Sequence, residues 1–480
     1  MLVTPDRILK KTFGHNEFRP IQAEVVSQVM AGDHVLLLMA TGAGKSLCYQ
    51  IPALLLPGLT LVISPLIALM QDQVAALTAR GVAATFINSA LDREQRQERL
   101  ARLAAGDYKL LYVTPERFRK QEFVEIIKGR EISLLAVDEA HCISQWGHDF
   151  RPDYSRLQEI RASLNNPTTI ALTATATPEV QEDIIIQLGL TKSQVTVFNQ
   201  GIERANLQLL VDDVHGHGAK LAAIAHARRQ TRGSTIVYFA LIKSLERMSE
   251  ALTDMGLDHL VYHGGLTASA RRRRQERFMA AGDALILATN AFGLGVDKSD
   301  IRMVIHAEIP ASLESYYQEI GRAGRDGKAS RCLLLYDQDD LLIQMNFIKW
   351  NNPEADFYQR LWQVISDEPE EVNSGGLDGL KERLLFRHKA DFRLETALAL
   401  LERYQVTRGS LARRDLAVAG ELPDRFGPGE IGAKTLAEQK KLHLMVQYCK
   451  TKGCRKGYVH DYFGVDHPDS CGTCDNCQSL

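Results

Sequence analysis

The chain has 480 residues, of which 45% are apolar and 24% charged, and its formal net charge at pH 7 is −2. This length predicts about three domains at ~150 residues each, and the composition is typical of a globular protein with several packed cores. The longest apolar runs fall far short of the ~18–20 residues that a membrane span needs. No signal segment opens the chain, so we expect a cytoplasmic protein without a membrane partner. A net charge near zero argues mildly against a compact nucleic-acid binder, but it does not exclude a local basic groove.

Up to about residue 346, short apolar runs alternate with amphipathic helical stretches. The first series of predicted strands is 34–39, 60–64, 109–114, 134–138 and 168–173. After a break near 198–206, a second series follows at 234–239, 258–262, 284–288, 303–306 and 331–336. Strands that alternate with helices favour parallel sheets, so we expect an α/β protein with two such lobes. Ligands should gather at the C-terminal ends of the strands and between the lobes.

The alternation ends after the second series. Residues 367–371 and 373–376 are polar and predict a loop. The stretch 390–404 is apolar on one helical face, and 405–414 could form a β-turn wing. Either a winged-helix-like insert or a plain helical spacer fits this pattern, and a basic helix from about residue 434 leads into a cysteine cluster. The expected domains are therefore 1–201, 202–346, 347–433 and 434–480.

A glycine-rich segment, Met-Ala-Thr-Gly-Ala-Gly-Lys-Ser at 39–46, lies between a predicted strand and the predicted helix 47–56. Glycines let backbone N–H groups close around phosphates, and the helix N-terminus adds partial positive charge. Lys45 would reach the β- and γ-phosphates of a nucleotide, and the Ser46 hydroxyl would bind Mg²⁺. The rest of the cradle would be Thr41, Gly42, Ala43 and Gly44. The strict form of this phosphate-binding pattern has glycine at the position of Met39, so the segment matches only the looser form. The alternative interpretation of the segment is a loop with a structural role and no bound phosphate.

An acidic pair, Asp138 and Glu139, ends another predicted strand. Asp138 can hold Mg²⁺ through water and Glu139 can polarise an attacking water, which is the division of labour that phosphoryl transfer needs. The alternative is a pair of acidic residues that only caps a strand end.

Two arginines three positions apart, Arg322 and Arg325, are flanked by glycines in the stretch 318–327. Such arginines can reach a γ-phosphate across a cleft and stabilise its charge during hydrolysis. We expect Arg325 to make this contact and Arg322 to assist. The alternative is a pair of surface arginines without this role.

Five of the eight cysteines crowd the last 32 residues of the chain. Cys454, Cys471, Cys474 and Cys477 supply four thiolates at a spacing that suits tetrahedral Zn²⁺. A closed four-thiolate site predicts a structural metal, and on its spacing Cys449 is not a ligand. An iron–sulfur cluster is the competing interpretation. The scattered cysteines Cys48, Cys142 and Cys332 are typical of buried small hydrophobes.

These segments, in this order, resemble superfamily 2 helicases, and in detail the RecQ family, over residues 1 to about 345 and again at about 440–477. The segments that carry the resemblance are 13–22, 63–73, 114–117, 144–154, 172–176, 262–266, 288–297 and 318–327. In the iron–sulfur helicases of a related family, the cysteines interrupt the first lobe, whereas here they close the chain, which favours zinc.

The resemblance also implies roles for individual residues. Arg19 and Gln22 would hold the adenine nucleotide. Ser64 and Thr114 would contact DNA in the first lobe, where hydroxyls and helix N-termini suit phosphate contacts. His263 would contact DNA in the second lobe. Trp146, Phe150 and Arg151 lie in the aromatic loop that senses single-stranded DNA in this family, and aromatic faces can stack on bases. The basic run 271–274 could add to a DNA surface, although such runs are more often a solvated helix face.

The resemblance implies an ATP-dependent 3′-to-5′ DNA helicase of repair or recombination that uses ATP, Mg²⁺ and Zn²⁺. The expected partners are single-stranded and partly duplex DNA, with a single-strand-binding protein as a further candidate. We expect a monomer, associated with the nucleoid in a bacterium. An RNA helicase is a weaker alternative, and a DNA-stimulated translocase that remodels or anneals DNA without strand separation is another. A C-terminal winged helix is not expected within this length, which leaves the strand-separating element open.

Overall fold

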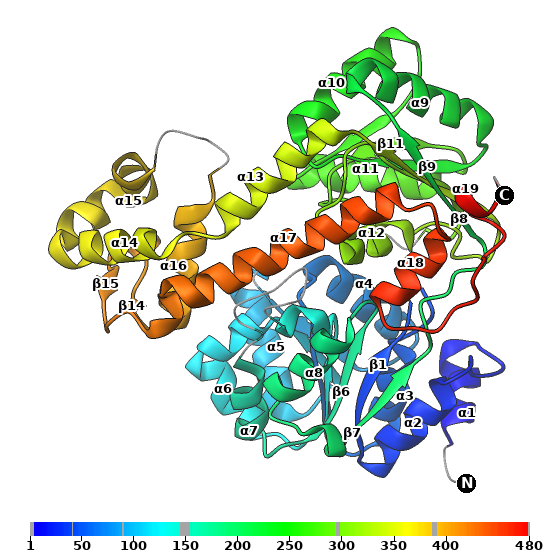
Figure 1. Cartoon of the computed structure of the whole chain (residues 1–480). Coiled ribbons are helices and arrows are strands. Elements are labelled where there is room, and N and C mark those ends of the chain that lie inside the picture. The colour runs from blue at the N-terminus through cyan, green and yellow to red at the C-terminus, as the bar shows by residue number, and fades with distance from the viewer. Residues whose placement is uncertain are drawn as a thin grey trace. The chain divides into compact units, whose positions relative to one another are not determined.

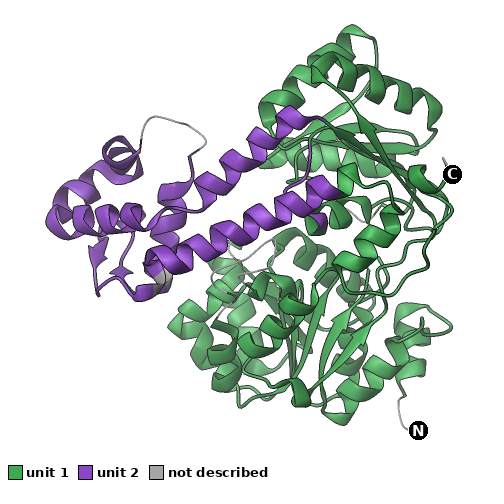
Figure 2. Ribbon diagram, viewed as in Figure 1, with its two compact units in different colours: residues 1–308, 314–336, 448–480 green, residues 309–313, 337–447 purple. Residues whose placement is uncertain are grey.

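The computed structural model describes residues 4–40, 42–88, 91–144, 154, 156–293, 298–385 and 391–478. Two compact units make up the chain (Figure 2). Unit 1 comprises residues 1–308, 314–336 and 448–480, and unit 2 comprises residues 309–313 and 337–447. The predicted chemical motifs that the structure describes all belong to unit 1.

Unit 1 contains a seven-stranded sheet, the core of the first lobe, in the order β3-β4-β2-β5-β6-β1-β7. Every neighbouring pair in this sheet is parallel. Its strands are β1 (His34–Leu38), β2 (Leu59–Ile63), β3 (Ala84–Ile87), β4 (Leu110–Val113), β5 (Ile132–Val137), β6 (Thr168–Thr173) and β7 (Val195–Asn199). All five residues of β2 are buried, as expected for a parallel strand covered by helices on both faces.

A six-stranded parallel sheet forms the core of the second lobe, in the order β10-β11-β9-β12-β13-β8. Its strands are β8 (Leu207–Asp213), β9 (Ser234–Tyr238), β10 (Leu260–Tyr262), β11 (Leu285–Ala288), β12 (Ile301–His306) and β13 (Ser330–Tyr336). The two parallel sheets confirm the predicted α/β class. Strands β3, β7 and β8 were not predicted, and the predicted break at 198–206 is wrong at its start, because Phe198 and Asn199 pair with β1.

Helices separate the strands along both lobes (Figure 1). They are α1 (Pro5–Ile8), α2 (Gln22–Ala31), α3 (Leu47–Leu55), α4 (Ile67–Ala79), α5 (Arg93–Ala105), α6 (Gln121–Lys128), α7 (Leu157–Ser163), α8 (Pro178–Gln187), α9 (Gly216–Gln230), α10 (Ile242–Asp254), α11 (Ala268–Ala280) and α12 (Leu313–Ile320). Local sequence accounts for many of their ends. In α8, for example, the Thr177 side chain accepts from Val180 N and Pro178 occupies the first turn, which is a favourable start for a helix.

Unit 2 is helical, with one small antiparallel strand pair (Figure 1). Its elements are α13 (Leu341–Asn351), α14 (Ala355–Asp367), α15 (Pro369–Leu384), α16 (Arg393–Arg403), β14 (Thr407–Arg408), β15 (Ala417–Val418) and α17 (Pro428–Lys450), whose last three residues belong to unit 1. Phe357, Leu361, Leu394 and Leu401 are fully or almost fully buried in its core. The helical character predicted for this part of the chain is confirmed, while the winged-helix-like alternative stays a prediction.

The loop predicted at 367–371 and 373–376 is wrong, because this segment is almost entirely helical. Helix α15 begins at Pro369 and continues through Gly376, where φ is 61° and ψ −155° and the helix kinks. Polar composition suggested a loop, but Pro369 and the acidic Glu370 and Glu371 are favourable in a first helical turn. The pairing of Arg383 with Glu368 and Glu371 further stabilises this turn.

The C-terminal part of unit 1 holds α18 (Arg455–Tyr462) and the short α19 (Asp475–Gln478). This small helical module carries the cysteine cluster. Among the described residues, no helix is both long enough and apolar enough to cross a bilayer. The predicted domain boundaries after residues 201, 346 and 433 stay predictions.

Candidate functional site

The glycine-rich segment forms the turn between β1 and α3, at the C-terminal edge of the first sheet. Gly42 and Gly44 have φ values of 79° and 89°, in the left-handed region that favours glycine. A Cβ on Gly44 would lie 2.7 Å from Gln22 Nε2, so the close approach of Gln22 also requires glycine there. Thr41, the predicted cradle residue before Gly42, lies outside the described residues.

The N-terminal motif packs directly against this turn. Gln22 is buried, and its Nε2 donates to the carbonyl oxygens of Ala43 at 3.3 Å and Gly44 at 3.1 Å. Arg19 donates from its backbone N to Gln22 Oε1 and from Nη1 to Gly42 O at 3.1 Å. The predicted nucleotide residues of two separate motifs therefore form one constellation.

Lys45 folds back onto the turn. Its Nζ donates to Met39 O at 3.0 Å. Removal from water lowers the pKa of Lys45, and the nearby carboxylates of Glu139 and Asp138 partly oppose this shift. A bound polyphosphate would supply the strong negative charge that this partly buried ammonium lacks.

The acidic pair follows β5 at the same sheet edge. Glu139 has φ 48° and ψ 48°, a left-handed conformation that is uncommon for a residue other than glycine. Burial and the neighbouring Glu139 raise the pKa of Asp138 to about 7, although Lys45 opposes the rise. Bringing a divalent cation to this carboxylate would favour its charged form.

Glu139 also faces the end of β6. Its Oε2 lies 3.4 Å from His141 Nδ1, which is itself 3.0 Å from Thr173 Oγ1. Oε2 is buried and accepts no hydrogen bond from the described residues. An acceptor in this condition is well suited to orient a water molecule.

The two arginines of 318–327 occupy different surroundings. A Cβ on Gly42 would lie 3.1 Å from Arg325 Cδ, and the charge of Arg325 contributes to lowering the pKa of Lys45. Arg322 instead donates to Gly293 O, within the second lobe. Of the pair, Arg325 is therefore the one beside the phosphate turn.

Arg204, which the sequence analysis missed, holds the loop that carries both arginines. Its guanidinium donates to the carbonyl oxygens of Gly321 at 3.2 Å, Ala323 at 2.7 Å and Gly324 at 3.2 Å. Asn206 Nδ2 donates to Gly324 O at 2.8 Å and Lys328 O at 2.9 Å. These partners are more than a hundred residues apart in sequence, so local pattern carries no signal for them.

The predicted DNA contacts are only partly described. Ser64 and Thr114 follow β2 and β4, which are neighbours in the first sheet, and His263 follows β10 in the second. Ser64 is 2% exposed, so its hydroxyl does not present itself to a ligand in this structure. Trp146, Phe150 and Arg151 lie outside the described residues. In the basic run, Arg272 pairs with Glu276 and Arg274 donates to Val261 O.

The four predicted metal ligands come together. The Sγ atoms of Cys454, Cys471, Cys474 and Cys477 all lie within 4.8 Å of one another. Four thiolates around Zn²⁺ at ~2.3 Å would have sulfur atoms roughly 3.8 Å apart, so the donor set fits this ion. Although burial opposes it, hydrogen bonds from Thr473 and from Cys474 N lower the pKa of Cys471 to about 6, which favours the ligating thiolate.

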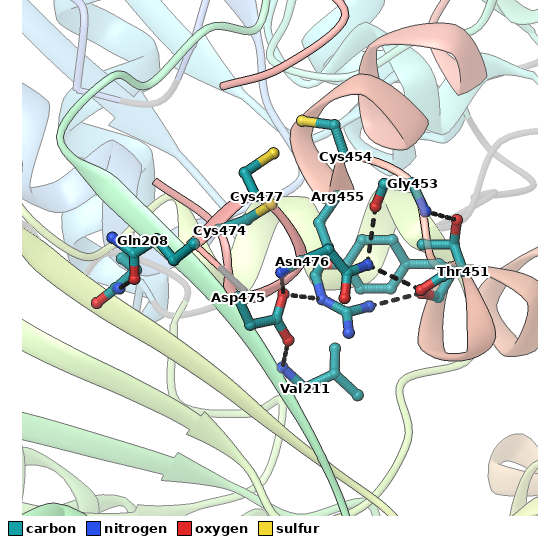
Figure 3. Close-up of polar contacts among 12 residues, drawn as sticks. Gln208, Val211, Thr451, Gly453, Cys454, Arg455, Cys474, Asp475, Asn476 and Cys477 are labelled. Atoms are coloured by element: carbon teal, nitrogen blue, oxygen red, sulfur yellow. Dashed lines mark hydrogen bonds and ion pairs between the residues drawn. The ribbon is translucent and has the colours of Figure 1, made fainter. Parts of the chain in front are cut away.

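The cysteine module is fastened to the edge strand of the second sheet (Figure 3). Asp475 Oδ2 accepts from Val211 N of β8 at 2.9 Å, and Asp475 Oδ1 pairs with Arg455. Lys456 Nζ donates at 3.1 Å to the backbone oxygen of Arg204, the residue whose side chain holds the arginine loop. The module thus contacts both the sheet edge and the residue that holds that loop.

Three protein families match the chain in the order of the motifs. The family described as "DEAD/DEAH box helicase" matches residues 19–184, and "Helicase conserved C-terminal domain" matches residues 217–327. The family described as "RecQ zinc-binding" matches residues 428–478, which include all four clustered cysteines.

Full-length relatives extend these matches. The "ATP-dependent DNA helicase RecQ" of Bacillus subtilis is 38% identical over 99% of this chain and 67% of its own length. The protein of the same name from Haemophilus influenzae is 42% identical over 76% of this chain and 58% of its own length. The "Probable ATP-dependent DNA helicase RecS" of Bacillus subtilis is 40% identical over 75% of this chain and 73% of its own length. The chain thus spans between about half and three quarters of these relatives.

Solved structures share the fold at low identity. "DEAD-box helicase Mss116 bound to ssRNA and UDP-BeF" has a TM-score of 0.58 at 16% identity, over 97% of this chain and 98% of that one. The "Mycobacterium smegmatis helicase Lhr bound to ssDNA and AMP-PNP" has a TM-score of 0.57 at 19% identity, over 91% of this chain and 62% of that one. These likenesses support two RecA-like lobes, as predicted.

Proposed function

This chain belongs to the RecQ family of ATP-dependent DNA helicases, and from that membership we propose that it couples ATP hydrolysis to 3′-to-5′ movement on single-stranded DNA. By this movement it would unwind duplexes during repair or recombination. The observation that carries the proposal is the convergence of Lys45, the Asp138–Glu139 pair and Arg325 around the phosphate turn.

The proposed nucleotide site assigns one task to each residue. Arg19 and Gln22 hold the adenine nucleotide beside the turn made by Gly42, Ala43 and Gly44. Lys45 exchanges its bond to Met39 O for the β- and γ-phosphates. Ser46 and Asp138 would hold Mg²⁺, which when bound neutralises phosphate charge.

Hydrolysis then depends on the chain's own polar groups. Glu139 orients and polarises the attacking water with the oxygen that accepts no other hydrogen bond from the described residues. Arg325 stabilises charge on the transferred phosphoryl group, and Arg322 assists from the second lobe. The contact between Gln318 Nε2 and Thr175 Oγ1, at 3.4 Å, is a route by which the state of this site reaches the second lobe.

The remaining assignments follow the family resemblance. Single-stranded DNA is proposed to contact Ser64, Thr114 and His263, with Trp146, Phe150 and Arg151 as sensors. A contact with Ser64 requires the structure around its buried hydroxyl to open. Zinc at the four cysteines has a structural role, because four thiolates leave no open coordination position. We further propose a monomer that acts in the cytoplasm, at the nucleoid in a bacterium, beside a single-strand-binding protein.

Unwinding of duplexes that carry a 3′ or a 5′ single-stranded tail tests the proposal, with ATP hydrolysis followed in parallel. We expect unwinding of the 3′-tailed duplex only, and hydrolysis that single-stranded DNA stimulates. Lys45→Ala should lower hydrolysis by at least ~100-fold while single-strand binding survives, because a preorganised charge contact to the reacting group is lost.

The matched control is Lys192→Ala, which removes an exposed lysine of the same lobe and should change neither activity. Retained DNA-stimulated hydrolysis in Lys45→Ala would contradict the nucleotide site. Stimulated hydrolysis without unwinding of either duplex would replace the helicase proposal with a translocase that remodels or anneals DNA.

A further inference from the structure

The strand pair of unit 2 forms a short wing, defined here as residues 407–418. Thr407 and Arg408 of β14 pair with Val418 and Ala417 of β15, and residues 409–416 connect them. Figure 1 shows this pair beside α14 and α16, and residues of α14 and α16 contact it. The wing is therefore an attached part of the unit 2 fold.

Hydrogen bonds close the loop of the wing on itself. Ser410 N donates to Asp415 Oδ1 at 2.8 Å, and Arg413 N donates to Ser410 O at 3.1 Å. Gly409 has φ 76°, and a Cβ there would collide with Asp415 O, so the chain can turn this tightly only at glycine. The loop presents its side chains from a defined backbone.

Two anchors hold the wing to the helices of unit 2. Asn373 of α15 donates to Leu416 O at 2.9 Å and accepts from Leu416 N at 2.9 Å. Trp362 Nε1 of α14 donates to Gly420 O at 3.0 Å, just after β15. A preorganised loop loses less entropy on binding than a flexible one.

The wing carries three exposed arginines, Arg408, Arg413 and Arg414. None of the three forms an ion pair with another described residue. Elsewhere in unit 2, Arg360 pairs with Asp356, Arg383 with Glu368 and Glu371, and Arg393 with Asp391. Lys349 of α13 and Lys440 of α17 are also exposed and form no ion pair with a described residue, but they are single lysines on long helices. The wing brings three unpaired arginines together within seven residues.

The composition of the wing indicates its ligand. Proteins bind single-stranded nucleic acid through a positively charged groove combined with aromatic side chains that stack on bases, and residues 407–418 contain no aromatic residue. Duplex DNA presents a regular array of phosphates that cations alone can bind, independently of sequence. Arginine is well matched to such phosphates because its guanidinium donates two parallel hydrogen bonds.

We propose that the wing is a binding site for the phosphate backbone of double-stranded DNA, with Arg408, Arg413 and Arg414 as its contacts. This inference deepens the proposed function and rests on the chain acting on DNA. The wing would add a contact with duplex DNA to the single-strand contacts proposed for the motor.

Binding of the full chain to a blunt fluorescent duplex of about 20 base pairs, at several salt concentrations, tests the proposal. Each phosphate contact contributes a slope of about −0.9 to the logarithmic salt dependence. Arg413→Ala with Arg414→Ala should therefore make the slope less steep by roughly 2 and weaken duplex binding on the order of tenfold or more at 0.1 M salt. Arg413→Lys with Arg414→Lys keeps the charge and should recover most of the binding.

The matched control is Arg360→Ala with Arg383→Ala, which removes the same charge from arginines that already have carboxylate partners. It should leave the salt slope unchanged. An unchanged slope in the wing variant, or an equal change in the control, would overturn the proposal. Single-strand-stimulated ATP hydrolysis should be normal in both variants, and its absence from the unaltered chain would sink the proposed motor function instead.

Discussion

Asp138 and Lys45 are both held where their charged forms are disfavoured. Burial lowers the pKa of Lys45 and raises that of Asp138 to about 7, although the two groups attract each other. Charged groups that a fold keeps partly desolvated are costly, and such groups concentrate at functional sites. These two desolvated groups therefore lower the stability of the nucleotide-free fold, and a bound nucleotide and cation would compensate their charges.

A pH dependence of stability follows from the raised pKa of Asp138. Between about pH 4 and pH 7 the folded chain keeps a proton that the unfolded chain has released, so this group's contribution to stability is lost as pH rises through that window. Asp138→Asn has no such titration. Its melting temperature without nucleotide, measured by thermal unfolding from pH 5 to pH 8, should rise relative to the unaltered chain as pH increases.

Asp283 supplies the control, because its hydrogen bond to Arg228 lowers the pKa of that carboxyl. Asp283→Asn should show no such gain toward high pH. A difference between Asp138→Asn and the unaltered chain that is the same at every pH would show that Asp138 titrates normally in the fold.

At the scale of elements, the loop after α12 depends on a segment far away in sequence. Gly324 has φ 56°, and Asn206 Nδ2 packs where a Cβ would lie. Arg204 and Asn206, in the connection between β7 and β8, satisfy four carbonyl oxygens of residues 321–328. The orientation of Arg325 therefore rests on a segment that contains no recognisable motif.

Arg204 is accordingly expected to be a positioning residue for Arg325. Arg204→Ala should lower the DNA-stimulated kcat on the order of tenfold or more with little change in KM for ATP, because the affected contact matters mainly in the transition state. Arg204→Lys should recover little, since one ammonium cannot reproduce the planar donors of a guanidinium.

A double-mutant cycle separates positioning from general damage. In an Arg325→Ala background, Arg204→Ala should cost nothing further if Arg204 acts through Arg325. Arg229→Ala, which removes an exposed arginine of the same lobe, should leave kcat unchanged. Additive losses in the cycle would assign Arg204 an independent role.

At the scale of unit 1, the zinc module covers the open edge of the second sheet. Strand β8 is the last strand of its sheet, and Asp475 satisfies the N–H of Val211 on that edge. Exposed strand edges invite pairing with other chains. Closing the four-cysteine site thus also protects the sheet.

Zinc removal should therefore destabilise the fold and expose the edge strand β8. A chelator should lower the melting temperature on the order of 10 °C, because the binding free energy of a structural metal contributes to folding. Light scattering should rise at the same time, and added Zn²⁺, but not Mg²⁺, should reverse both effects in the short term. Asp475→Asn should keep its zinc yet scatter more than the unaltered chain, and unchanged scattering in both cases would refute the edge-covering role.

Where chemistry is local, the sequence was a sufficient guide. All ten predicted strands of the two lobes exist. They could be recognised in the sequence because each is a run of β-branched and aliphatic residues between more polar helical segments. The phosphate turn and the cysteine spacing were readable because glycine and thiolate requirements act over a few residues. Short or half-exposed strands such as β3, β7 and β8 lacked that contrast, and β7 has an exposed, polar pattern at Thr196 and Asn199.

The sequence by itself determined the family, the order of the lobes and the identities of the residues able to carry phosphate and metal chemistry. Only the tertiary structure decided which arginine lies beside the phosphate turn, that Arg204 holds its loop, that Ser64 is buried and that the zinc module closes a sheet edge. The physical reason is one of range. Backbone conformation and ligand spacing are set by near neighbours in the chain, whereas burial and long-range hydrogen bonds depend on segments that meet only after folding.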